Sequence, residues 1–459
     1  MIPTTDFYAG ITIAIAFLML LALAEFLRSW AQWSVEWTRK LVHFGGGLVC
    51  LGFPYFIQSQ WVVLALAISL GAIFLVSRQL RLLSSVHCIQ RQSHGVEYYP
   101  LVIYLLFLLA ADQPWIYMIC VLVLSVSDAV AALVGTRFGR IRYRVEEETK
   151  SVEGSLAFFA ATFVVVLVPL ILLRPQFDSL HVPYWHYVLA ANLIGLLVTC
   201  FEAVSGRGRD NLFIPLGTYL VLSKTFQTDV WDLAMQNFSF ALILIVLIGL
   251  SRYSRSFQTG GAIVICLASY GCWAMGSFDW ALPVFLGYGL YVVAALTTDL
   301  PWRLSIRPVV FNVLPPFLIL AAGNLALNQG HPEWMQFCFG PFLASCVVAL
   351  AEAVVNAVNW RHPGPESRRW IHGLLAGIGC SLLLVIPSAI RLVMQDWLTI
   401  AGLVGVSATI SAVSSRVLPA ISPAVASWRW YGARMGIATL AAIVIALLQW
   451  QRLSQVWFV

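Results

Sequence analysis

Long apolar segments separated by short polar turns recur from one end of this 459-residue chain to the other. Many approach the ~17–25 residues that an α-helix needs to cross the hydrocarbon core of a bilayer. The pattern therefore predicts an all-α, polytopic transmembrane helical bundle of about 14–16 spans. The predicted spans are 8–27, 41–57, 61–77, 100–112, 115–135, 155–173, 186–204, 211–223, 238–251, 260–276, 280–298, 309–323, 336–358, 371–390, 397–413 and 433–450.

The composition agrees with a membrane protein. Hydrophobic residues make up 60% of the chain and the mean hydropathy is +0.85, which excludes an ordinary soluble domain. The first apolar segment, Phe7 to Leu27, is too long for a signal peptide and lacks a basic start and a small-residue cleavage site, so we expect it to remain as the first span. The nine cysteines are scattered without a CxxC or metal-like spacing and are interpreted as small buried hydrophobes.

Arginine and lysine are concentrated in alternate turns, which predicts the orientation of the chain. Under the positive-inside rule these turns face the cytoplasm and the N-terminus lies outside. The net charge of +6 is therefore interpreted as a topology signal, and we expect no nucleic-acid partner. The basic turns contain Arg28, Arg39, Lys40, Arg78, Arg81, Arg91, Arg137 to Lys150, Arg207, Arg209, Arg252, Arg255, Arg303, Arg307, Arg361, Arg368, Arg369, Arg416 and Arg429.

A first polar cluster lies at the start of the second span. On a helix Arg39 and His43 are four residues apart and share a face, with Lys40 beside them. Arginine and lysine at a cytoplasmic helix start can serve only as topology anchors, and a histidine one turn inside can be a structural hydrogen-bonding group. The glycines at 45–47 permit close helix packing, and they also permit a phosphate or head group to approach. Taken together, the cluster favours a functional site.

A second cluster begins with Asp128, near the cytoplasmic end of an apolar span. An ionisable group at such a depth is costly and marks a site or a partnered polar network. A carboxylate there could hold Mg²⁺, a hard ion that bridges to phosphate oxygens. Ala131 and Gly135 have the spacing of small residues in helix packing. The arginines at 137, 140, 142 and 144 could be anchors or part of the site.

The segment from Lys150 to Gly154 starts the next span. Ser151 is predicted to be the N-cap of that helix, with Glu153 in its first turn. A helix N-terminus presents free backbone N–H groups to a phosphate, and Lys150 adds a positive charge. The spacing is not that of a Walker A motif.

Two further groups of polar residues are weaker signals. Glu202, near the cytoplasmic end of its span, repeats the argument made for Asp128. Asp210 and Asn211 precede an apolar run and could either cap a helix or contribute to a site. Gly95 and Tyr99 lie at another cytoplasmic helix start, where they could be ordinary loop residues.

Together these residues resemble the CTP-dependent lipid-alcohol kinases, a family that includes dolichol kinase, phytol kinase and fungal-type diacylglycerol kinase. The resemblance covers roughly residues 20–225 and is most specific in its second element. The gap from Gly139 to Lys150 is longer than in the family pattern, and a single lysine stands where some members have two basic residues. The matching elements are Arg39-Lys40-Leu41-Val42-His43, Gly95 with Tyr99 and Pro100, Asp128-x-x-Ala131-x-x-x-Gly135-x-x-x-Gly139, Lys150-Ser151-x-Glu153-Gly154, and Asp210-Asn211-Leu212 with Pro215-Leu216.

The resemblance implies a magnesium-dependent transfer of phosphate from CTP to a lipid alcohol at the cytoplasmic face of the membrane. The candidate catalytic residues are Asp128, His43, Lys150 and Glu153. The candidate metal ligands are Asp128, Glu202 and Asp210. The candidate residues for binding CTP are Arg39, Lys40, Gly135, Gly139, Lys150, Ser151 and Gly154, with Asn211, Gly95 and Tyr99 as further members of the site.

The second half of the chain is expected to be a separate membrane domain. Thr259-Gly260-Gly261-Ala262 and Arg307 to Asn312 resemble elements of the membrane family that includes phytyl-phosphate kinase. Where that family carries acidic motifs, this chain has Glu352 and Asn356, and the expected second aspartate near 402–405 is absent. We therefore predict a kinase-like domain at 1–235 and a fused, inactive module at 236–459.

The acceptor alcohol remains open among polyprenol or dolichol, phytol and diacylglycerol, as does the oligomeric state. A phosphatidate cytidylyltransferase that makes a CDP-lipid is an alternative with the same donor, metal and membrane setting. It is disfavoured because its closing acidic-basic signature is missing. A transporter or a non-catalytic scaffold is an alternative of another class. It is disfavoured because the polar clusters gather at the cytoplasmic ends of helices and not at mid-bilayer.

Overall fold

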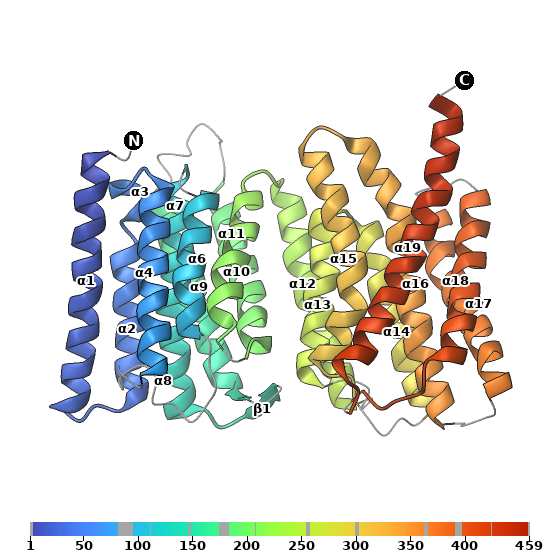
Figure 1. Ribbon diagram of the computed structural model, residues 1–459, viewed down its shortest axis with the longest axis horizontal. Helices are drawn as coiled ribbons and strands as arrows, with labels where there is room; N and C mark the ends of the chain where they lie inside the picture. Colours follow the sequence, from blue (N-terminus) through green and yellow to red (C-terminus); the bar gives the residue numbers. More distant parts are fainter. Residues whose placement is uncertain are drawn as a thin grey trace. The chain divides into compact units, whose positions relative to one another are not determined.

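The computed structural model describes residues 3–80, 95–110, 112–145, 148–173, 183–206, 208–253, 258–298, 303–361, 366–390, 397–423 and 425–457. These residues are almost entirely helical, and the chain divides into two compact units, Met1–Ala241 and Leu242–Val459. Figure 1 shows the helices of each unit standing side by side. The prediction of an all-α polytopic bundle is confirmed.

Eleven helices in the described residues are long and apolar enough to cross a membrane, and three further apolar helices are shorter. Each predicted span falls on a helix, because a segment that is apolar all round can satisfy its backbone in a bilayer only by internal hydrogen bonds. The outward N-terminus stays a prediction. Of the basic residues on which it rests, Arg81, Arg91, Arg207 and Arg255 lie outside the described residues.

Unit 1 consists of a helical bundle with one small hairpin at one end. Its elements are α1 (Thr4–Ser29), α2 (Val35–Cys50), α3 (Phe53–Phe56), α4 (Gln60–Gln79), α6 (Gly95–Ala110), α7 (Pro114–Leu122), the π-helix η1 (Val123–Ser127), α8 (Asp128–Phe138), β1 (Arg142–Val145), β2 (Glu148–Ser151), α9 (Val152–Leu172), α10 (Tyr184–Val204), α11 (Asp210–Thr225) and the first half of α12 (Val230–Tyr253). The predicted domain boundary at 235/236 falls inside α12. Figure 1 shows the hairpin at the same end of the unit as the start of α2 and the end of α8.

The arginine-rich segment after α8 forms an antiparallel β-hairpin, where the sequence suggested a cationic loop. Arg142 pairs with Ser151 and Val145 with Glu148. The backbone of Val152 then donates to Ile141 O at 2.9 Å, so the hairpin leads directly into α9. The apolar-polar alternation from 142 to 145 is short, and it becomes a strand only because a partner strand lies beside it.

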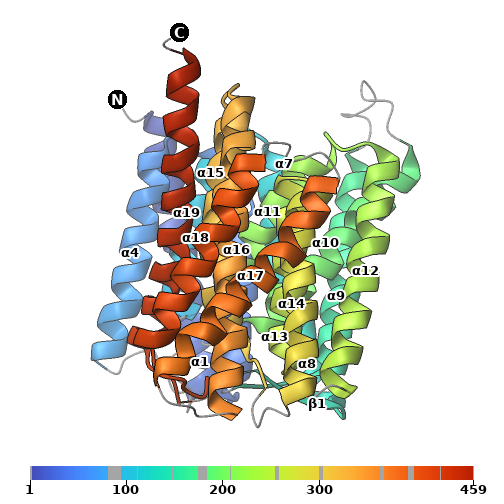
Figure 2. The same cartoon turned by 90° about the vertical axis from the view of Figure 1, so that its right-hand side faces the viewer.

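Unit 2 is built around one buried helix. Its elements are α13 (Thr259–Met275), α14 (Phe278–Thr298), α15 (Ile306–Asn328), α16 (Pro332–Arg361), α17 (Glu366–Ile390), α18 (Trp397–Val417) and α19 (Trp428–Trp457). Helix α16 contacts α14, α15, α17, α18 and α19. Of the residues in its apolar 18-residue stretch, 89% are buried. Figure 2 shows it among these neighbours.

The acidic residue singled out in the second half is engaged in an internal network. Glu352 of α16 accepts hydrogen bonds from Ser414 Oγ and from Arg434 Nε, the latter at 3.1 Å. One turn further on, Asn356 exchanges two hydrogen bonds with the backbone of Ile421, each 3.0 Å long. These contacts join α16 to α18, to α19 and to the segment between them. The inactivity of this module stays a prediction.

Helices α17 and α18 cross closely because glycines line their contact. A Cβ placed on Gly377 would lie 2.6 Å from the Cα of Ala408 and 3.0 Å from Ser407 O, whereas a Cβ on Gly379 would meet nothing within 4 Å. Small residues at such crossings let helix backbones approach in a membrane.

Replacing Gly377 by alanine should therefore lower the stability of the protein in detergent by about 1–3 kcal/mol, because the helices must separate to admit the methyl group. Gly379→Ala is the matched control on the same helix and should be neutral or slightly stabilising. Thermal unfolding of both variants checks this, and equal midpoints would contradict the packing argument.

Candidate active site

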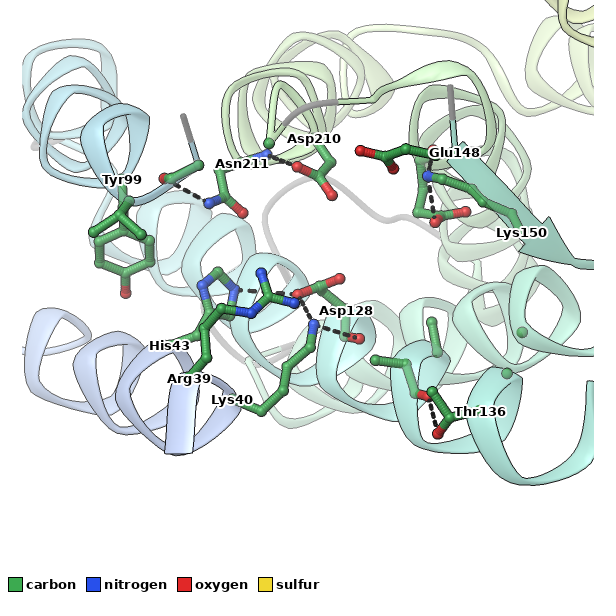
Figure 3. A pocket seen from close by; sticks show the side chains of 18 of the residues that line it. Arg39, Lys40, His43, Tyr99, Asp128, Thr136, Glu148, Lys150, Asp210 and Asn211 are labelled. Carbon is green, nitrogen blue, oxygen red and sulfur yellow. Dashed lines mark hydrogen bonds and ion pairs between the residues drawn. The ribbon is translucent and has the colours of Figure 1, made fainter. Parts of the chain in front are cut away.

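A cavity of about 470 Å³ lies at the end of unit 1 that carries the hairpin. Its lining includes all but two of the predicted site residues, although they come from elements far apart in the sequence. These are Arg39, Lys40, His43, Gly95, Tyr99, Asp128, Gly135, Lys150, Ser151, Gly154, Glu202, Asp210 and Asn211. Figure 3 shows how the labelled members face one another across the cavity. The exceptions are Gly139 and Glu153.

Asp128 forms the first ion pair of the site. Lys40 Nζ lies 2.5 Å from Asp128 Oδ2 and 3.3 Å from Asp128 O, and His43 Nε2 lies 3.6 Å from the same carboxylate oxygen. All three side chains are largely buried, with 12–17% of their surface exposed. The predicted cationic cluster on α2 therefore faces the predicted acid on α8.

Local backbone geometry makes this approach possible. The turn before Asp128 is the π-helix η1, a distortion frequent at functional sites. The Leu124 carbonyl in that turn contacts His43 Nε2 at 3.0 Å. A Cβ on Gly47 would collide with the Ser125 side chain, so a glycine is required where α2 packs on η1. The glycine run thus acts in close helix packing.

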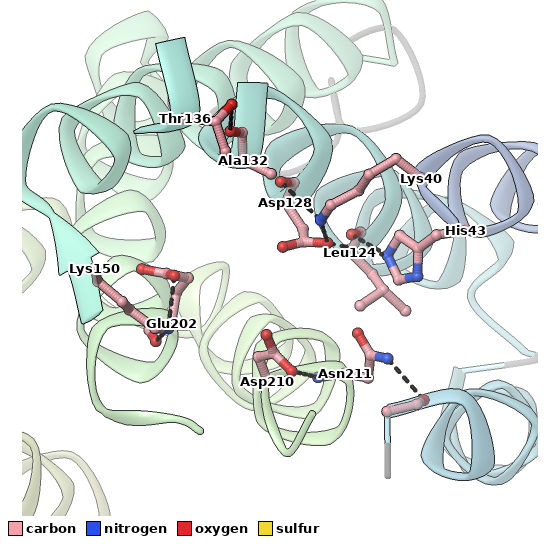
Figure 4. A network of polar contacts seen from close by, with 11 residues as sticks. Lys40, His43, Leu124, Asp128, Ala132, Thr136, Lys150, Glu202, Asp210 and Asn211 are labelled. Carbon is pink, nitrogen blue, oxygen red and sulfur yellow. Dashed lines mark hydrogen bonds and ion pairs between the residues drawn. The ribbon is translucent and has the colours of Figure 1, made fainter. Parts of the chain in front are cut away.

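Lys150 forms the second ion pair, with Glu202 at the end of α10. Lys150 Nζ lies 2.7 Å from Glu202 Oε1 and also donates to the Glu202 carbonyl. Burial lowers the pKa of Lys150, but the carboxylates of Glu202 and Asp210 outweigh burial and hold that pKa well above its usual value. Lys150 therefore stays positively charged inside the cavity. Figure 4 shows this pair on the side of the cavity opposite Lys40 and His43.

The hairpin holds Lys150 in place. Its cross-strand neighbour Tyr143 is hydrogen-bonded through its hydroxyl to Ser155 Oγ at 2.7 Å. Burial, together with the carboxylate of Glu202, raises the pKa of Tyr143 to about 12, so the phenol stays neutral and keeps its proton for hydrogen bonding. Tyr143 thereby ties the strand to the first turn of α9.

The predicted helix start at Ser151 is confirmed. Ser151 is the N-cap of α9, and its Oγ accepts from Gly154 N at 3.1 Å. Glu153 turns away from the cavity, because its carboxylate accepts from Ile141 N at 3.0 and 3.2 Å. Glu153 therefore holds the hairpin against α9. It does not line the cavity, so its predicted catalytic role finds no support in the geometry.

The glycines of this region serve helix packing. A Cβ on Gly154 would lie 3.2 Å from both Ala131 O and the Cα of Gly135, so α8 and α9 touch at this point. Gly139 caps α8 and does not line the cavity. Gly135 and Gly154 do line it, so they combine close packing with an open approach for a ligand.

Asp210 and Asn211 close the remaining side at the start of α11. Asp210 Oδ1 accepts from Asn211 N at 3.0 Å, and Asn211 Nδ2 donates to Gly95 O at 2.8 Å. The second bond joins α11 to α6, where Tyr99 packs edge-on against the His43 ring with the ring centres 5.3 Å apart. Asn211, Gly95 and Tyr99 thus lie against Asp210 and His43 at this side of the cavity.

Sequence reasoning left open whether Arg142 belongs to the site, and it missed four further lining residues in or beside the hairpin: Thr136, Glu148, Thr149 and Ser155. Glu148 and Lys150 are two residues apart, which is the spacing of side chains on one face of a strand. This spacing could have predicted the strand that carries them into the cavity. It was hidden by interpreting residues 137–150 as a loop.

The carboxylates of the cavity are hard oxygen donors of the kind that Mg²⁺ prefers. Magnesium bound with a nucleotide needs only one or two protein carboxylates in addition to phosphates and waters. Among the described residues no group of three or more His, Cys, Asp or Glu forms a closed metal site. Asp128 and Asp210 line the same cavity, and no cation of the described chain pairs with Asp210. The donor set fits a metal shared with a nucleotide.

Glu202→Gln should lower the pKa of Lys150, because it removes an opposite charge while burial remains. The pH profile of acetic anhydride labelling, read by mass spectrometry, should move its Lys150 midpoint to lower pH. Lys224, which does not line the cavity, serves as the internal reference. An unchanged Lys150 midpoint would show that Glu202 is not its charge partner.

Comparison with known proteins found a relative that matches less than half of this chain's length. A phytol kinase from Synechocystis sp. is 34% identical to this chain over 201 residues, which make up 43% of this chain and 83% of the relative. No family model matches the chain, and no solved structure matches it.

Proposed function

The chain belongs to the family of membrane lipid-alcohol kinases that includes phytol kinase, and we propose that it transfers the γ-phosphate of CTP to the hydroxyl group of a lipid alcohol. The alcohol oxygen forms a bond to γ-phosphorus, the bond between that phosphorus and the β–γ bridging oxygen breaks, and CDP leaves. The hydroxyl proton is released. The name of the relative favours phytol or another isoprenoid alcohol over diacylglycerol.

The observation that carries this proposal is the pairing of Lys40 with Asp128 and of Lys150 with Glu202 around one cavity. Phosphoryl transfer requires positioning and charge neutralisation more than covalent chemistry. Two buried lysines, joined by Arg39 and Arg142 in the lining, are suitable partners for a triphosphate.

The ion pairs also explain how the protein tolerates these buried charges. A buried lysine without a partner is costly, and so is a buried carboxylate. Each pair compensates both members until a triphosphate arrives. Phosphate oxygens can then replace the carboxylates at Lys40 and Lys150, which leaves the acids available to a cation.

Asp128 and Asp210 are the proposed ligands of a nucleotide-bound Mg²⁺, with Glu202 as an additional acid. When bound, the metal neutralises charge on the transferring phosphoryl group. Asn211 holds the start of α11, and with it Asp210, in place through its bond to Gly95.

His43 is suited to orient the acceptor hydroxyl. A carbonyl oxygen can only accept, so the contact with Leu124 O assigns the ring proton to Nε2 in the neutral form. Nδ1 then carries the lone pair that can accept a hydrogen bond from the alcohol. The loose transition state of phosphoryl transfer makes orientation the main demand, with proton acceptance a late event.

The cytoplasmic side of the membrane is the proposed location of the reaction. The cavity lies at the helix ends next to Arg39, Lys40, Arg142 and Lys150, and basic residues at helix ends favour the cytoplasm. Cellular CTP would reach the cavity from that side.

Purified full-length protein should convert labelled CTP and phytol or a polyprenol into the alkyl phosphate and CDP, with ATP a poorer donor. Product analysis distinguishes the alternatives, since release of pyrophosphate from phosphatidate and CTP indicates a cytidylyltransferase. Solute flux in liposomes without nucleotide consumption indicates a transporter.

Asp128→Asn should lower the rate of phosphate transfer about 10²-fold or more, because the uncharged amide removes a metal donor and releases Lys40. Asp112→Asn, the same change at an exposed acid in the turn between α6 and α7, is the control and should keep wild-type activity. Thermal unfolding shows that each variant is folded. Near-normal rates in folded Asp128→Asn would refute the metal assignment.

A further inference from the structure

One part of the cavity lining is apolar and has no use in binding phosphates. Phe17 of α1, Val42 of α2, Leu70 and Phe74 of α4 and Val96 of α6 line it. Phe74 is buried together with Leu21, and Val42, Leu70 and Val96 pack around them. These residues form a continuous apolar wall between four helices of unit 1.

Helices α2 and α6, which carry Val42 and Val96 of the apolar wall, lie on the side of the cavity opposite the hairpin (Figure 3). Figure 3 shows Tyr99, His43 and Arg39 on one side, Lys150 and Glu148 on the other, and Asp128 and Asp210 between them. Tyr99 and Val96 share α6, and Val42 is the neighbour of His43 on α2. His43 therefore marks the junction of the apolar and charged parts.

The helices that contribute Phe17 and Leu70 are among the least buried of the candidate spans in the described residues. Only 22% of the residues in the apolar 18-residue stretch of each helix, α1 and α4, are buried. Helix α1 packs chiefly on α2, where a Cβ on Gly46 would lie 3.2 Å from the Phe17 ring, and α4 packs chiefly on α6. The contact between α1 and α4 is much smaller than the contact of either helix with its main neighbour.

We propose that this wall binds the hydrocarbon chain of the acceptor alcohol, which enters from the bilayer between α1 and α4 and presents its hydroxyl group at His43. The inference rests on the proposed function and adds the position and direction of the acceptor. A cavity of about 470 Å³ is within the ~300–1,000 Å³ of a site for one drug-sized ligand. A nucleotide and the whole of a long chain do not fit together, so the distal chain stays among the lipids.

The direction of entry limits what the acceptor can be. An alcohol with a single unbranched or isoprenoid chain places only that chain between α1 and α4. The wall recognises its first isoprene units by apolar contact, and chain length beyond these two helices has little influence on binding.

Leu70→Trp tests the subsite, with Leu75→Trp on the same helix as the matched control, because Leu75 is 50% exposed and does not line the cavity. Both are assayed with CTP and two acceptors, phytol and prenol. Prenol has the same allylic alcohol group but only one isoprene unit. Leu70→Trp should raise the KM for phytol about tenfold or more with an unchanged KM for CTP and a much smaller effect on prenol. Leu75→Trp should match the wild type.

The outcomes separate this inference from the proposed function. A wild-type protein that phosphorylates no lipid alcohol overturns both. A wild-type protein that phosphorylates phytol, with Leu70→Trp and Leu75→Trp kinetically alike, overturns only the subsite. Equal loss of activity toward phytol and prenol would also overturn it, since the substitution would then disturb the reacting groups.

Photolabelling of the unmodified protein provides a second test that does not depend on a folded variant. A phytol analogue with a diazirine on its hydrocarbon chain, within the first isoprene units, should label peptides that contain Phe17 or Leu70 to Phe74, and excess phytol should prevent this labelling. Labelling confined to other helices of unit 1, or to unit 2, would overturn the proposed entry.

Discussion

The ion pairs between Lys40 and Asp128 and between Lys150 and Glu202 are the constraint on which the site depends. Each joins groups that would be costly to bury alone, and each spans a long stretch of sequence, 88 residues in one case and 52 in the other. In a membrane protein with few charges, such pairs must be formed by the correct docking of whole helices. Close contacts at Gly47, Gly135 and Gly154 permit that docking.

The hairpin between α8 and α9 extends the site beyond the helices. It carries Lys150 into the cavity. Tyr143 attaches the first strand to α9 by its hydrogen bond with Ser155, and Glu153 of α9 binds the backbone of Ile141 just before that strand. A flexible loop with the same residues would lose more conformational entropy when a nucleotide binds. The strand pairing therefore preorganises a cation for phosphate binding, and the N-cap at Ser151 fixes the point where the helix begins.

The cavity is also suited to the proposed reaction between a soluble donor and a lipid acceptor. Its charged part lies beside polar helix ends, and its apolar part is shared by helices that face the bilayer. Asp128 and His43 lie where the two parts join, so that reacting groups from water and from lipid can be brought together there.

The sequence by itself determined the spans, the helix start at Ser151 and the membership of most of the site. These features depend on local physics: apolar segments must form helices in a bilayer, a serine hydroxyl caps the backbone within its own turn, and buried charges are too costly to be incidental. Only the tertiary structure decided that Lys150 pairs with Glu202, that Glu153 faces the hairpin, and that residues 142–145 and 148–151 form strands. Partner choice and orientation there depend on helix packing between remote segments, and no local pattern in the sequence records that packing.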